Sequence, residues 1–259
     1  MPTALITGAT TGLGRSFAQV LAEQGHDLVL VARSESDLKE RADLLRTGFG
    51  VRAEVLPADL TTDEGCARVT ARLVAEPVVE LLVNNAGIGY DQPFPRTGVR
   101  AEERLLDLNV RAVLRLTDAA LGAMTARRSG AVINVASIAG LGPAWLGSTY
   151  PASKAWVIGF TESLALSQQV RARGVRMLAL LPGYTRTEFH QRANIPATFP
   201  PAWLWLHPDD VVRAALRDLR GNKVLSTPSL RYKIAAWGLR HLPRPLSRKF
   251  AWDLSSTGH

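Results

Sequence analysis

Tyr150 and Lys154 are the residues of this chain whose types and spacing are best suited to acid–base chemistry. On a helix, side chains four residues apart lie on one face, about 5–6 Å apart at Cβ. Pro151 suits a first helical turn, where its missing N–H costs nothing. A neighbouring ammonium favours the phenolate and so lowers the pKa of a phenol. We therefore expect Tyr150 at a helix start, with a pKa lowered by Lys154, as a proton donor and acceptor.

A glycine-rich run near the N-terminus has the composition of a phosphate-binding turn. Thr7–Gly14, with the spacing Gly-x-x-x-Gly-x-Gly, follows an apolar strand and precedes a helical pattern. Glycines there allow a tight turn and let a pyrophosphate sit on the helix N-terminus. The residues expected at the cofactor are Gly8, Thr10, Thr11, Gly12, Leu13 and Gly14.

The end of the second apolar run indicates which dinucleotide binds. An acidic residue at this place would hydrogen-bond the ribose 2′-OH of NAD. Here Ala32 stands in that place and Arg33 follows it. A guanidinium donates two parallel hydrogen bonds to a phosphate. The sequence therefore predicts NADP(H) in preference to NAD(H).

Two later strand ends complete the predicted cofactor site. Asp59 and Leu60 follow the third apolar run. Asp59 could accept a hydrogen bond from the adenine amino group, cap the helix expected from residue 62, or do both. The fourth run ends in small residues that admit the cofactor's ribose, or form a plain turn. We expect contacts from Asn85, Ala86 and Gly87.

Apolar runs of strand length alternate with helix-period segments over the first 225 residues or so. The predicted strands are 3–7, 27–32, 52–57, 79–84, 130–136, 175–181 and 223–226, and the predicted helices are 12–24, 35–47, 62–75, 101–126, 150–172 and 208–220. Continuous Val/Leu runs are typical of strands buried on both faces of a parallel sheet. The alternation predicts a single-domain α/β fold, a Rossmann-type doubly wound parallel sheet of about seven strands with helices on both faces.

The motifs, taken in order, resemble the short-chain dehydrogenase/reductase family over about residues 3–226. The shared marks are Thr7–Gly14, Asp59, Asn84–Gly87, Asn109, Ser137, Tyr150, Lys154 and Pro182-Gly183. The resemblance implies that Asn109, Ser137, Tyr150 and Lys154 are catalytic. Tyr150 would exchange the proton, Ser137 would orient the substrate oxygen, and Lys154 would hold the nicotinamide ribose. Asn109 would fix a water that joins Lys154 to a proton relay.

The resemblance also implies a nicotinamide contact and a reaction. Pro182, Gly183, Thr185 and Thr187 would lie against the nicotinamide. The chain would be an NAD(P)-dependent oxidoreductase that interconverts a ketone and a secondary alcohol. A dinucleotide-sensing regulatory protein without turnover is the alternative. Such relatives usually lack the tyrosine or the lysine, which this chain keeps.

A long aromatic connection, 185–206, is expected to cover the substrate. Trp145, Phe189 and Trp203 are the expected substrate contacts, together with Ser137 and Tyr150, and Leu146, Ile195, Phe199 and Trp205 add apolar surface. Such a lining favours a hydrophobic substrate of acyl, steroid-like or polyketide type. The alternative is that these rings only pack the connection onto the body.

Composition and charge indicate where the protein works and with what. One cysteine and no signal peptide favour the cytoplasm.

The net charge is +8, of which residues 228–259 carry +5 (six Lys/Arg against Asp253). We therefore separate a catalytic domain, 1–227, from a basic amphipathic extension, 228–259. The extension could dock on the body, cover a neighbouring subunit or contact an anionic membrane. Nucleic-acid binding is not expected, because the body has no basic stripe with stacking aromatics. The family resemblance implies a dimer or tetramer.

Overall fold

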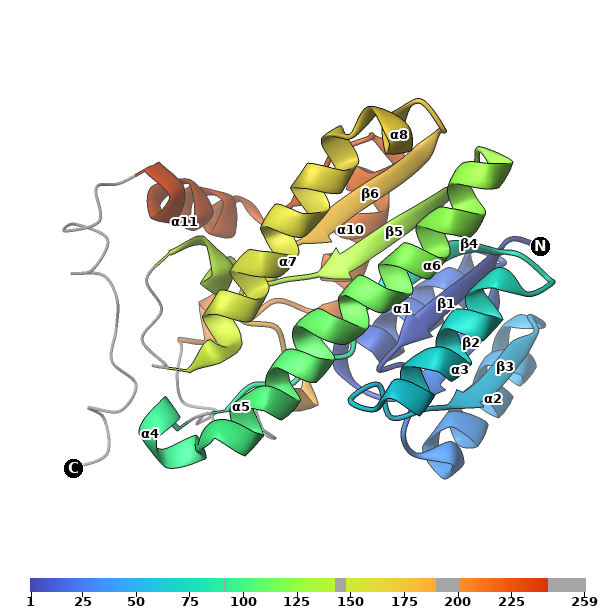
Figure 1. Cartoon of the computed structure of the whole chain (residues 1–259), viewed down its shortest axis with the longest axis horizontal. Helices are drawn as coiled ribbons and strands as arrows, with labels where there is room; N and C mark the ends of the chain where they lie inside the picture. Colours follow the sequence, from blue (N-terminus) through green and yellow to red (C-terminus); the bar gives the residue numbers. More distant parts are fainter. Residues whose placement is uncertain (91, 143–147, 190–200, 242–259) are drawn as a thin grey trace.

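One parallel sheet forms the centre of the computed structural model, which describes residues 1–90, 92–142, 148–189 and 201–241 (Figure 1). Its seven strands are β1 (Thr3–Thr7), β2 (Asp27–Ala32), β3 (Ala53–Pro57), β4 (Val79–Asn84), β5 (Gly130–Val135), β6 (Val175–Leu180) and β7 (Leu225–Ser226). Their order is β3-β2-β1-β4-β5-β6-β7, and every neighbouring pair is parallel. The chain direction across the sheet reverses between β1 and β4, which is where doubly wound folds bind ligands.

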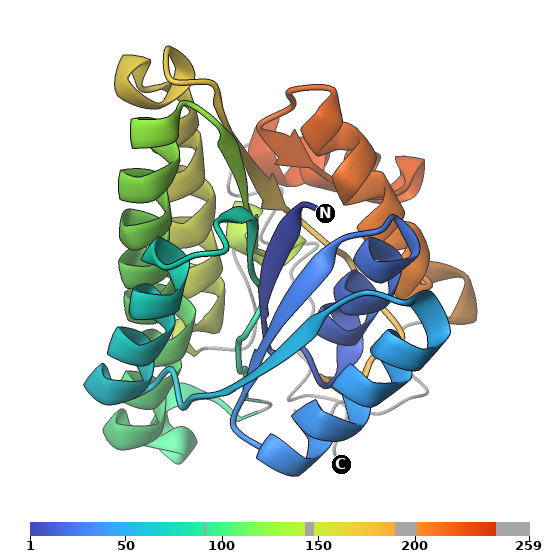
Figure 2. The same cartoon turned by 90° about the vertical axis from the view of Figure 1, so that its right-hand side faces the viewer.

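Helices cover both faces of the sheet, as Figure 2 shows. On one face lie α1 (Gly12–Glu23), α2 (Glu35–Phe49) and α10 (Pro208–Arg220); on the other lie α3 (Asp63–Val74), α6 (Ala112–Arg127), α7 (Thr149–Leu166) and α8 (Gln168–Arg171). Residues of β1 alternate between the two layers: Ile6 packs on the α1 side and Leu5 on the α6 side. The predicted fold class is confirmed.

Shorter elements surround the carboxyl ends of the strands. They are α4 (Phe94–Thr97), α5 (Val99–Leu106), the π-helical turn η1 (Asp107–Arg111), the 3₁₀ turns η2 (Ile138–Leu141) and η3 (Ala202–Leu204), and α11 (Leu230–His241). In Figure 1 all strand arrows point toward this end of the molecule. Within the described residues, no helix is both long and apolar enough to cross a membrane.

The two long predicted helices are interrupted in the structure. The segment predicted as 101–126 consists of α5, η1 and α6, and the segment predicted as 150–172 breaks after Leu166 and resumes in α8. In η1 the side chain of Asn109 turns inward and hydrogen-bonds both the N–H and the C=O of Ile88, at 3.0 and 2.8 Å. A π-turn inside a helix often marks a functional position, and periodicity alone does not reveal it.

A network of buried polar side chains links the sheet to the helices on one of its faces. Asn84 Nδ2 donates to Thr117 Oγ1 (3.1 Å) and to Asn134 Oδ1 (2.9 Å). Asn134 Nδ2 in turn donates to Thr161 Oγ1 at 3.0 Å. All four side chains take part in these bonds, although Asn84 Oδ1 has no hydrogen-bond partner among the described residues, and paired networks of this kind rigidify a core. This network therefore holds α6, β4, β5 and α7 in fixed register where the site lies.

Candidate dinucleotide and acid–base site

The glycine-rich run forms the predicted turn between β1 and α1. Gly8 and Gly12 have φ of +66° and +53°, a region that glycine enters without steric cost. A Cβ at Gly14 would lie 2.0 Å from the Gly8 carbonyl oxygen. The turn is therefore built from backbone packed on backbone, with no space for a side chain at Gly14.

The N-terminus of α1 receives an anionic group. Thr11 caps the helix in an extended conformation without a side-chain hydrogen bond. The N–H of Gly12 instead donates to the Glu188 carboxylate at 2.9 Å, and Arg15 pairs with the same carboxylate at 3.0 Å. Helix N-termini attract anions because their N–H groups are free and the dipole is positive there. The carboxylate occupies the kind of position that a pyrophosphate would take, so the turn fits a dinucleotide.

Sequence reasoning missed Glu188, although one signal was available. It is the only acid in the turn that follows β6, directly after Thr187. That turn reaches the glycine-rich loop, because a Cβ at Gly12 would lie 3.2 Å from the Cβ of Thr187. Thr10, Thr11 and Leu13 are half-buried around the same loop, as expected for residues beside a ligand.

Arg33 and Asp59 lie at the neighbouring strand ends, as predicted. Arg33 is exposed and has no ion-pair partner in the described part of the chain, so it is free to meet a phosphate. Asp59 accepts from the Thr61 N–H (3.0 Å) and Thr61 Oγ1 (2.7 Å) and pairs with Arg104 at 3.3 Å. Although burial raises the pKa of Asp59, these bonds and the arginines hold it below its usual value.

The capping role considered for Asp59 is wrong. The N-cap of α3 is Thr62, whose Oγ1 accepts the Gly65 N–H at 3.0 Å. The Asp59 side chain instead folds back on Thr61, two residues on, as aspartates commonly do in turns. Its neighbour Leu60 is buried under the site in the α3–α6 layer.

The segment after β4 is tied directly to β1. Thr7 Oγ1 accepts the N–H groups of Asn85 (2.9 Å) and Ala86 (3.0 Å), and Asn85 Nδ2 donates to the Thr7 carbonyl at 2.9 Å. Gly87 follows, and a Cβ there would lie 3.4 Å from Lys154 Nζ. The structure thus brings the predicted residues of both segments together at one sheet edge.

Tyr150 lies in the first turn of α7 as predicted, and a buried acid holds that helix start. Ser148 caps the helix and accepts the Tyr150 N–H at 3.3 Å. Glu102, which is 2% exposed, accepts the N–H and the hydroxyl of Thr149 at 3.0 and 2.5 Å. Burial raises the pKa of Glu102, but hydrogen bonds from Thr149 and Thr97 outweigh it and keep the pKa low. Sequence reasoning missed Glu102, because nothing local distinguishes it from the surface acid beside it.

The prediction of a lowered pKa for Tyr150 is wrong for the protein alone, because the net shift is upward. Burial raises the pKa of Tyr150 to about 12, and a hydrogen bond with Ser137 offsets this only in part. Burial also lowers the pKa of Lys154 to about 8. Lys154 Nζ donates to the Val135 carbonyl at 2.9 Å and lies 5.7 Å from the centre of the Tyr150 ring. The phenol is therefore held as a proton donor.

Ser137 and Asn109 lie beside this pair. Ser137 has an extended backbone and accepts the Ala139 N–H at 3.1 Å at the start of η2. Asn109 is 1% exposed, and its Nδ2 also donates to Ser153 Oγ at 3.3 Å. A Cβ at Gly87 would lie 3.2 Å from Asn109 Oδ1, close to its approach to Lys154. The water relay through Asn109 stays a prediction.

The turn after β6 is ordered by its own backbone. The Pro182 carbonyl accepts the Ile138 N–H at 3.2 Å, which ties the turn to the segment that carries Ser137. Thr185 is buried, and its Oγ1 donates to the Gly183 carbonyl at 3.0 Å. Thr187 Oγ1 points back to the Thr185 carbonyl at 3.4 Å. The predicted nicotinamide residues therefore share one turn that spans from Ser137 to the glycine-rich loop.

The predicted substrate residues have different positions. The Phe189 ring lies 5.8 Å from that of Tyr150. Trp203 in η3 is 62% exposed and makes no ring contact with Tyr150 in the described residues, so its substrate role stays a prediction. Trp145 lies outside the described residues, as do Leu146, Ile195 and Phe199.

The comparisons agree with this geometry. The family model described as short chain dehydrogenase matches residues 2–197. The chain belongs to this family. The 3-oxoacyl-(acyl-carrier-protein) reductase FabG of Vibrio cholerae is 35% identical, covering 74% of this chain and 76% of the relative. The very-long-chain 3-oxoacyl-CoA reductase of Bos taurus is 30% identical, covering 83% and 68%. The monensin polyketide synthase putative ketoacyl reductase of Streptomyces virginiae is 38% identical, covering 74% and 73%.

Solved structures of the family agree over nearly the whole length. A short-chain dehydrogenase from Sphingobium yanoikuyae in complex with NADPH has a TM-score of 0.86 and 35% identity, covering 96% of both chains. The bulky-bulky ketone specific alcohol dehydrogenase from Comamonas testosteroni has a TM-score of 0.79 and 31% identity, covering 94% of this chain and 95% of that one. Membership makes this protein an NAD(P)-dependent oxidoreductase that acts on CH–OH groups. The described residues hold no cluster of metal-ligating side chains.

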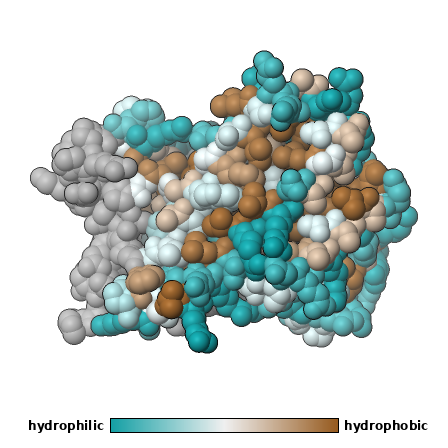
Figure 3. Space-filling view, in the orientation of Figure 1, coloured by the Kyte–Doolittle hydropathy of each residue, from teal (hydrophilic) through white to brown (hydrophobic). Residues whose placement is uncertain are grey.

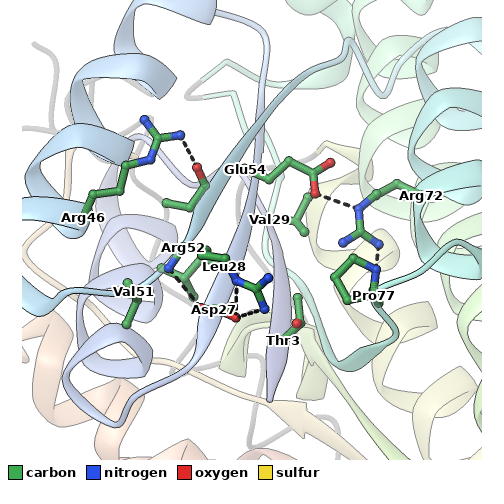
Figure 4. A pocket seen from close by; sticks show the side chains of 11 residues that line it. Thr3, Asp27, Leu28, Val29, Arg46, Val51, Arg52, Glu54, Arg72 and Pro77 are labelled. Atoms are coloured by element: carbon green, nitrogen blue, oxygen red, sulfur yellow. Dashed lines mark hydrogen bonds and ion pairs between the residues drawn. The ribbon is translucent and has the colours of Figure 1, made fainter. Parts of the chain in front are cut away.

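A cavity of about 530 Å³ at the opposite, amino ends of β1–β3 is not part of this short-chain dehydrogenase site (Figure 4). Its charged side chains are all paired: Arg52 meets Asp27 at 2.6 Å, Arg72 meets Glu54 at 2.8 Å, and Arg46 meets Asp43 outside the cavity at 2.7 Å. A smaller cavity of about 430 Å³ adjoins Gly12 and Arg15 at the N-terminus of α1. Only the second adjoins the predicted cofactor residues.

Proposed function

We propose that this short-chain dehydrogenase is an NADP(H)-preferring reductase of a hydrophobic ketone, most closely of the 3-oxoacyl type. The observation that carries the proposal is the position of Ser137, Tyr150 and Lys154 at the sheet edge beside the glycine-rich turn. The acyl preference is supported by relatives named as 3-oxoacyl and ketoacyl reductases. The Phe189 ring beside Tyr150 adds apolar surface at the reacting centre.

The site residues suit reduction of a carbonyl. A bound NADPH would supply the hydride for the carbonyl carbon. Ser137 orients the carbonyl oxygen, and Tyr150 donates its hydroxyl proton to that oxygen, so the ketone becomes a secondary alcohol. A pKa of about 12 keeps this proton on Tyr150 at working pH. Lys154, anchored on the Val135 carbonyl, keeps its ammonium beside the ring and stabilises the phenolate that remains.

The preference for NADP(H) is proposed from Arg33. Its guanidinium lies at the end of β2, where a 2′-phosphate of a dinucleotide on the β1–α1 turn would be placed. It is exposed and without an ion-pair partner among the described residues. A neighbour in the family was solved with NADPH bound, which agrees with this proposal.

Loss of NADPH absorbance with a panel of carbonyl compounds tests the proposal. The panel holds short and long 3-oxoacyl thioesters, bulky aromatic ketones, steroid ketones and sugars, each assayed with NADPH and with NADH. We expect the highest kcat/KM for an acyl thioester with NADPH. Tight NADPH binding with no turnover on any compound would favour the dinucleotide-sensing alternative. A sugar as the best substrate would contradict the hydrophobic assignment.

The exposed face of α11 is proposed as a contact for an anionic membrane surface. Leu230, Ile234 and Trp237 recur at helical spacing and are 73%, 64% and 62% exposed. Arg231 and Lys233 lie beside them and are also exposed. A basic helix with an apolar face that holds tryptophan suits such a surface. The division at residue 227 remains a prediction, and the part of the extension beyond residue 241 lies outside the described residues.

Vesicle co-sedimentation tests this contact. Vesicles with anionic lipid should retain the full-length protein, and Ile234→Ser with Trp237→Ser should lower the bound fraction. Val74→Ser, an equally exposed site at the end of α3, serves as the control. Equal binding of all variants, or equal binding to purely zwitterionic vesicles, would contradict the proposal.

A homo-oligomer is proposed through the face formed by α5, α6 and α7. Figure 3 shows apolar side chains gathered over the helices that face the viewer. Leu106, Leu114 and Leu166 are 39%, 44% and 65% exposed there. A second copy of the chain would cover them. Light scattering should show a dimer or tetramer that Leu114→Glu dissociates; an unchanged mass for that variant would contradict this interface.

A further inference from the structure

The C-terminal helix α11 is attached to the body through a buried phenol. Tyr232 is 3% exposed, whereas its neighbours on the helix are exposed. Its hydroxyl makes two hydrogen bonds, accepting the Tyr184 N–H at 3.1 Å and donating to the Leu204 carbonyl at 2.8 Å. Both partners are backbone groups, so the bonds fix the path of the main chain.

The ring of Tyr232 packs directly on Gly183. A Cβ at Gly183 would lie 2.2 Å from two ring carbons, so only glycine admits the ring here. Gly183 and Tyr184 belong to the turn expected against the nicotinamide. The ring and the hydroxyl therefore hold two consecutive residues of that turn from the side of α11.

The same hydroxyl joins the turn to a second segment. The Leu206 N–H donates to the Tyr184 carbonyl at 2.9 Å, and the Arg186 N–H donates to the Leu206 carbonyl at 3.0 Å. Tyr232 adds the bond to Leu204, two residues before this bridge. Together with the Tyr184–Tyr232 bond, these four hydrogen bonds close a small unit, in which the Tyr232 side chain joins the two backbone segments.

We propose that Tyr232 is a positioning residue for the reaction. It fixes the position of the Gly183–Thr185 turn relative to the dinucleotide and so sets the affinity of the protein for the dinucleotide. The proposal rests on the proposed function only in that this turn touches the cofactor. Burial raises the pKa of Tyr232 to about 12, so the hydroxyl keeps the proton that it donates throughout the working range. Removing the hydroxyl deletes both of these hydrogen bonds to partly buried backbone groups, which is costly.

Tyr232→Phe tests the role, because it keeps the ring on Gly183 and removes only the hydroxyl. We expect the dissociation constant for NADPH, followed by its fluorescence, to rise about tenfold. Amide exchange should quicken in the peptide that contains Tyr184. Leu45→Val is the matched control: this residue is buried in α2, away from the turn, and its loss of one methylene lowers stability in the same core layer.

The outcomes separate a positioning role from a structural one. An unchanged affinity for NADPH in folded Tyr232→Phe would overturn the proposal. An equal loss of NADPH affinity in Leu45→Val, at a melting temperature similar to that of Tyr232→Phe, would also overturn it. Affinity would then depend on stability alone.

A measurement on the unaltered protein covers the case in which Tyr232→Phe does not fold. Coupling between two sites is reciprocal. NADPH binding should therefore slow amide exchange in α11, and an unchanged exchange there would overturn the proposal. Because these readouts need no substrate, they stand apart from the proposed function, which fails if Tyr150→Phe keeps its turnover.

Discussion

The two ends of the central sheet hold similar polar side chains in opposite arrangements. At the amino ends of β1–β3, Asp27 accepts three hydrogen bonds from Arg52, and Glu54 pairs with Arg72 (Figure 4). At the carboxyl ends, Lys154 donates to a neutral carbonyl, and Arg33 has no ion-pair partner within the described residues. Both ends are hollowed, but the cavity at the carboxyl ends is lined by Arg41 and Arg186, which form no ion pair among the described residues.

The difference separates stability from function. Paired charges stabilise the folded state, and because they already have partners they interact only weakly with a ligand. A buried cation beside a neutral phenol lowers the stability of the folded state, and it remains available to interact with a bound molecule. The size of a cavity is therefore a weaker guide to this site than the pairing of the groups that line it. Four changes test the contrast, from the largest expected effect to the smallest.

Tyr150→Phe should have the largest effect, at the carboxyl end. Loss of the proton donor should lower kcat by about 10²–10⁴-fold, the usual range for a general acid. NADPH affinity, measured by fluorescence titration, should stay nearly unchanged, because the ring still packs beside Phe189. A variant that keeps its turnover would remove Tyr150 from the role of acid.

Lys154→Met should change how stability depends on pH. The folded protein holds the pKa of Lys154 at about 8, against 10.5 for an ordinary lysine. The unfolded chain therefore binds more protons between these values, and the free energy of unfolding rises with pH across them. Integrated over the shift, the gain is at most about 3 kcal/mol.

Urea unfolding from pH 7 to pH 10 measures this gain. The series stops there because Tyr150, with a pKa of about 12, keeps its proton in the folded state and opposes the trend above pH 10. In Lys154→Met the rise above pH 8 should be absent. A variant with the same pH dependence as the wild type would show that Lys154 is not desolvated in the folded protein.

Arg33→Ala should reduce the discrimination between the two dinucleotides. Charge-assisted hydrogen bonds to a phosphate are worth about 1.5–3 kcal/mol, so the ratio of NADPH to NADH affinity should fall by about 10- to 100-fold. The affinity for NADH should hardly change. Lys39→Ala on α2, whose ammonium pairs with Glu35 at 2.8 Å, is the control. An unchanged ratio would assign the preference to another residue.

Asp27→Asn should have the smallest effect and only on stability. Burial raises the pKa of Asp27, but the bonds from Arg52 outweigh it and hold the pKa low. Because Arg52 is largely exposed, the loss should be about 1–2 kcal/mol of unfolding free energy, measured by urea titration. A marked loss of NADPH affinity would show that the two ends of the sheet are coupled. It would contradict the separation of stability at the amino ends from binding at the carboxyl ends.

Local pattern was enough to predict the sheet and most of the site. The glycine spacing after β1 requires a turn with positive φ, and apolar runs buried on both faces require parallel strands. Because the carboxyl ends of parallel strands meet at one edge, the sequence alone places residues as far apart as Gly8 and Tyr150 in one site. The family's motifs supplied the roles of Ser137 and Asn109.

Only the tertiary structure decided the electrostatics and the supports of the site. The pKa of Tyr150 depends on burial, and the direction of the Lys154 ammonium depends on the Val135 carbonyl. Glu102, Glu188 and Tyr232 contact the site across 47, 176 and 48 residues of sequence, at Thr149, Gly12 and Tyr184. Periodicity and spacing describe neighbours along the chain, whereas these interactions depend on which distant surfaces are packed together and on how much water that packing removes.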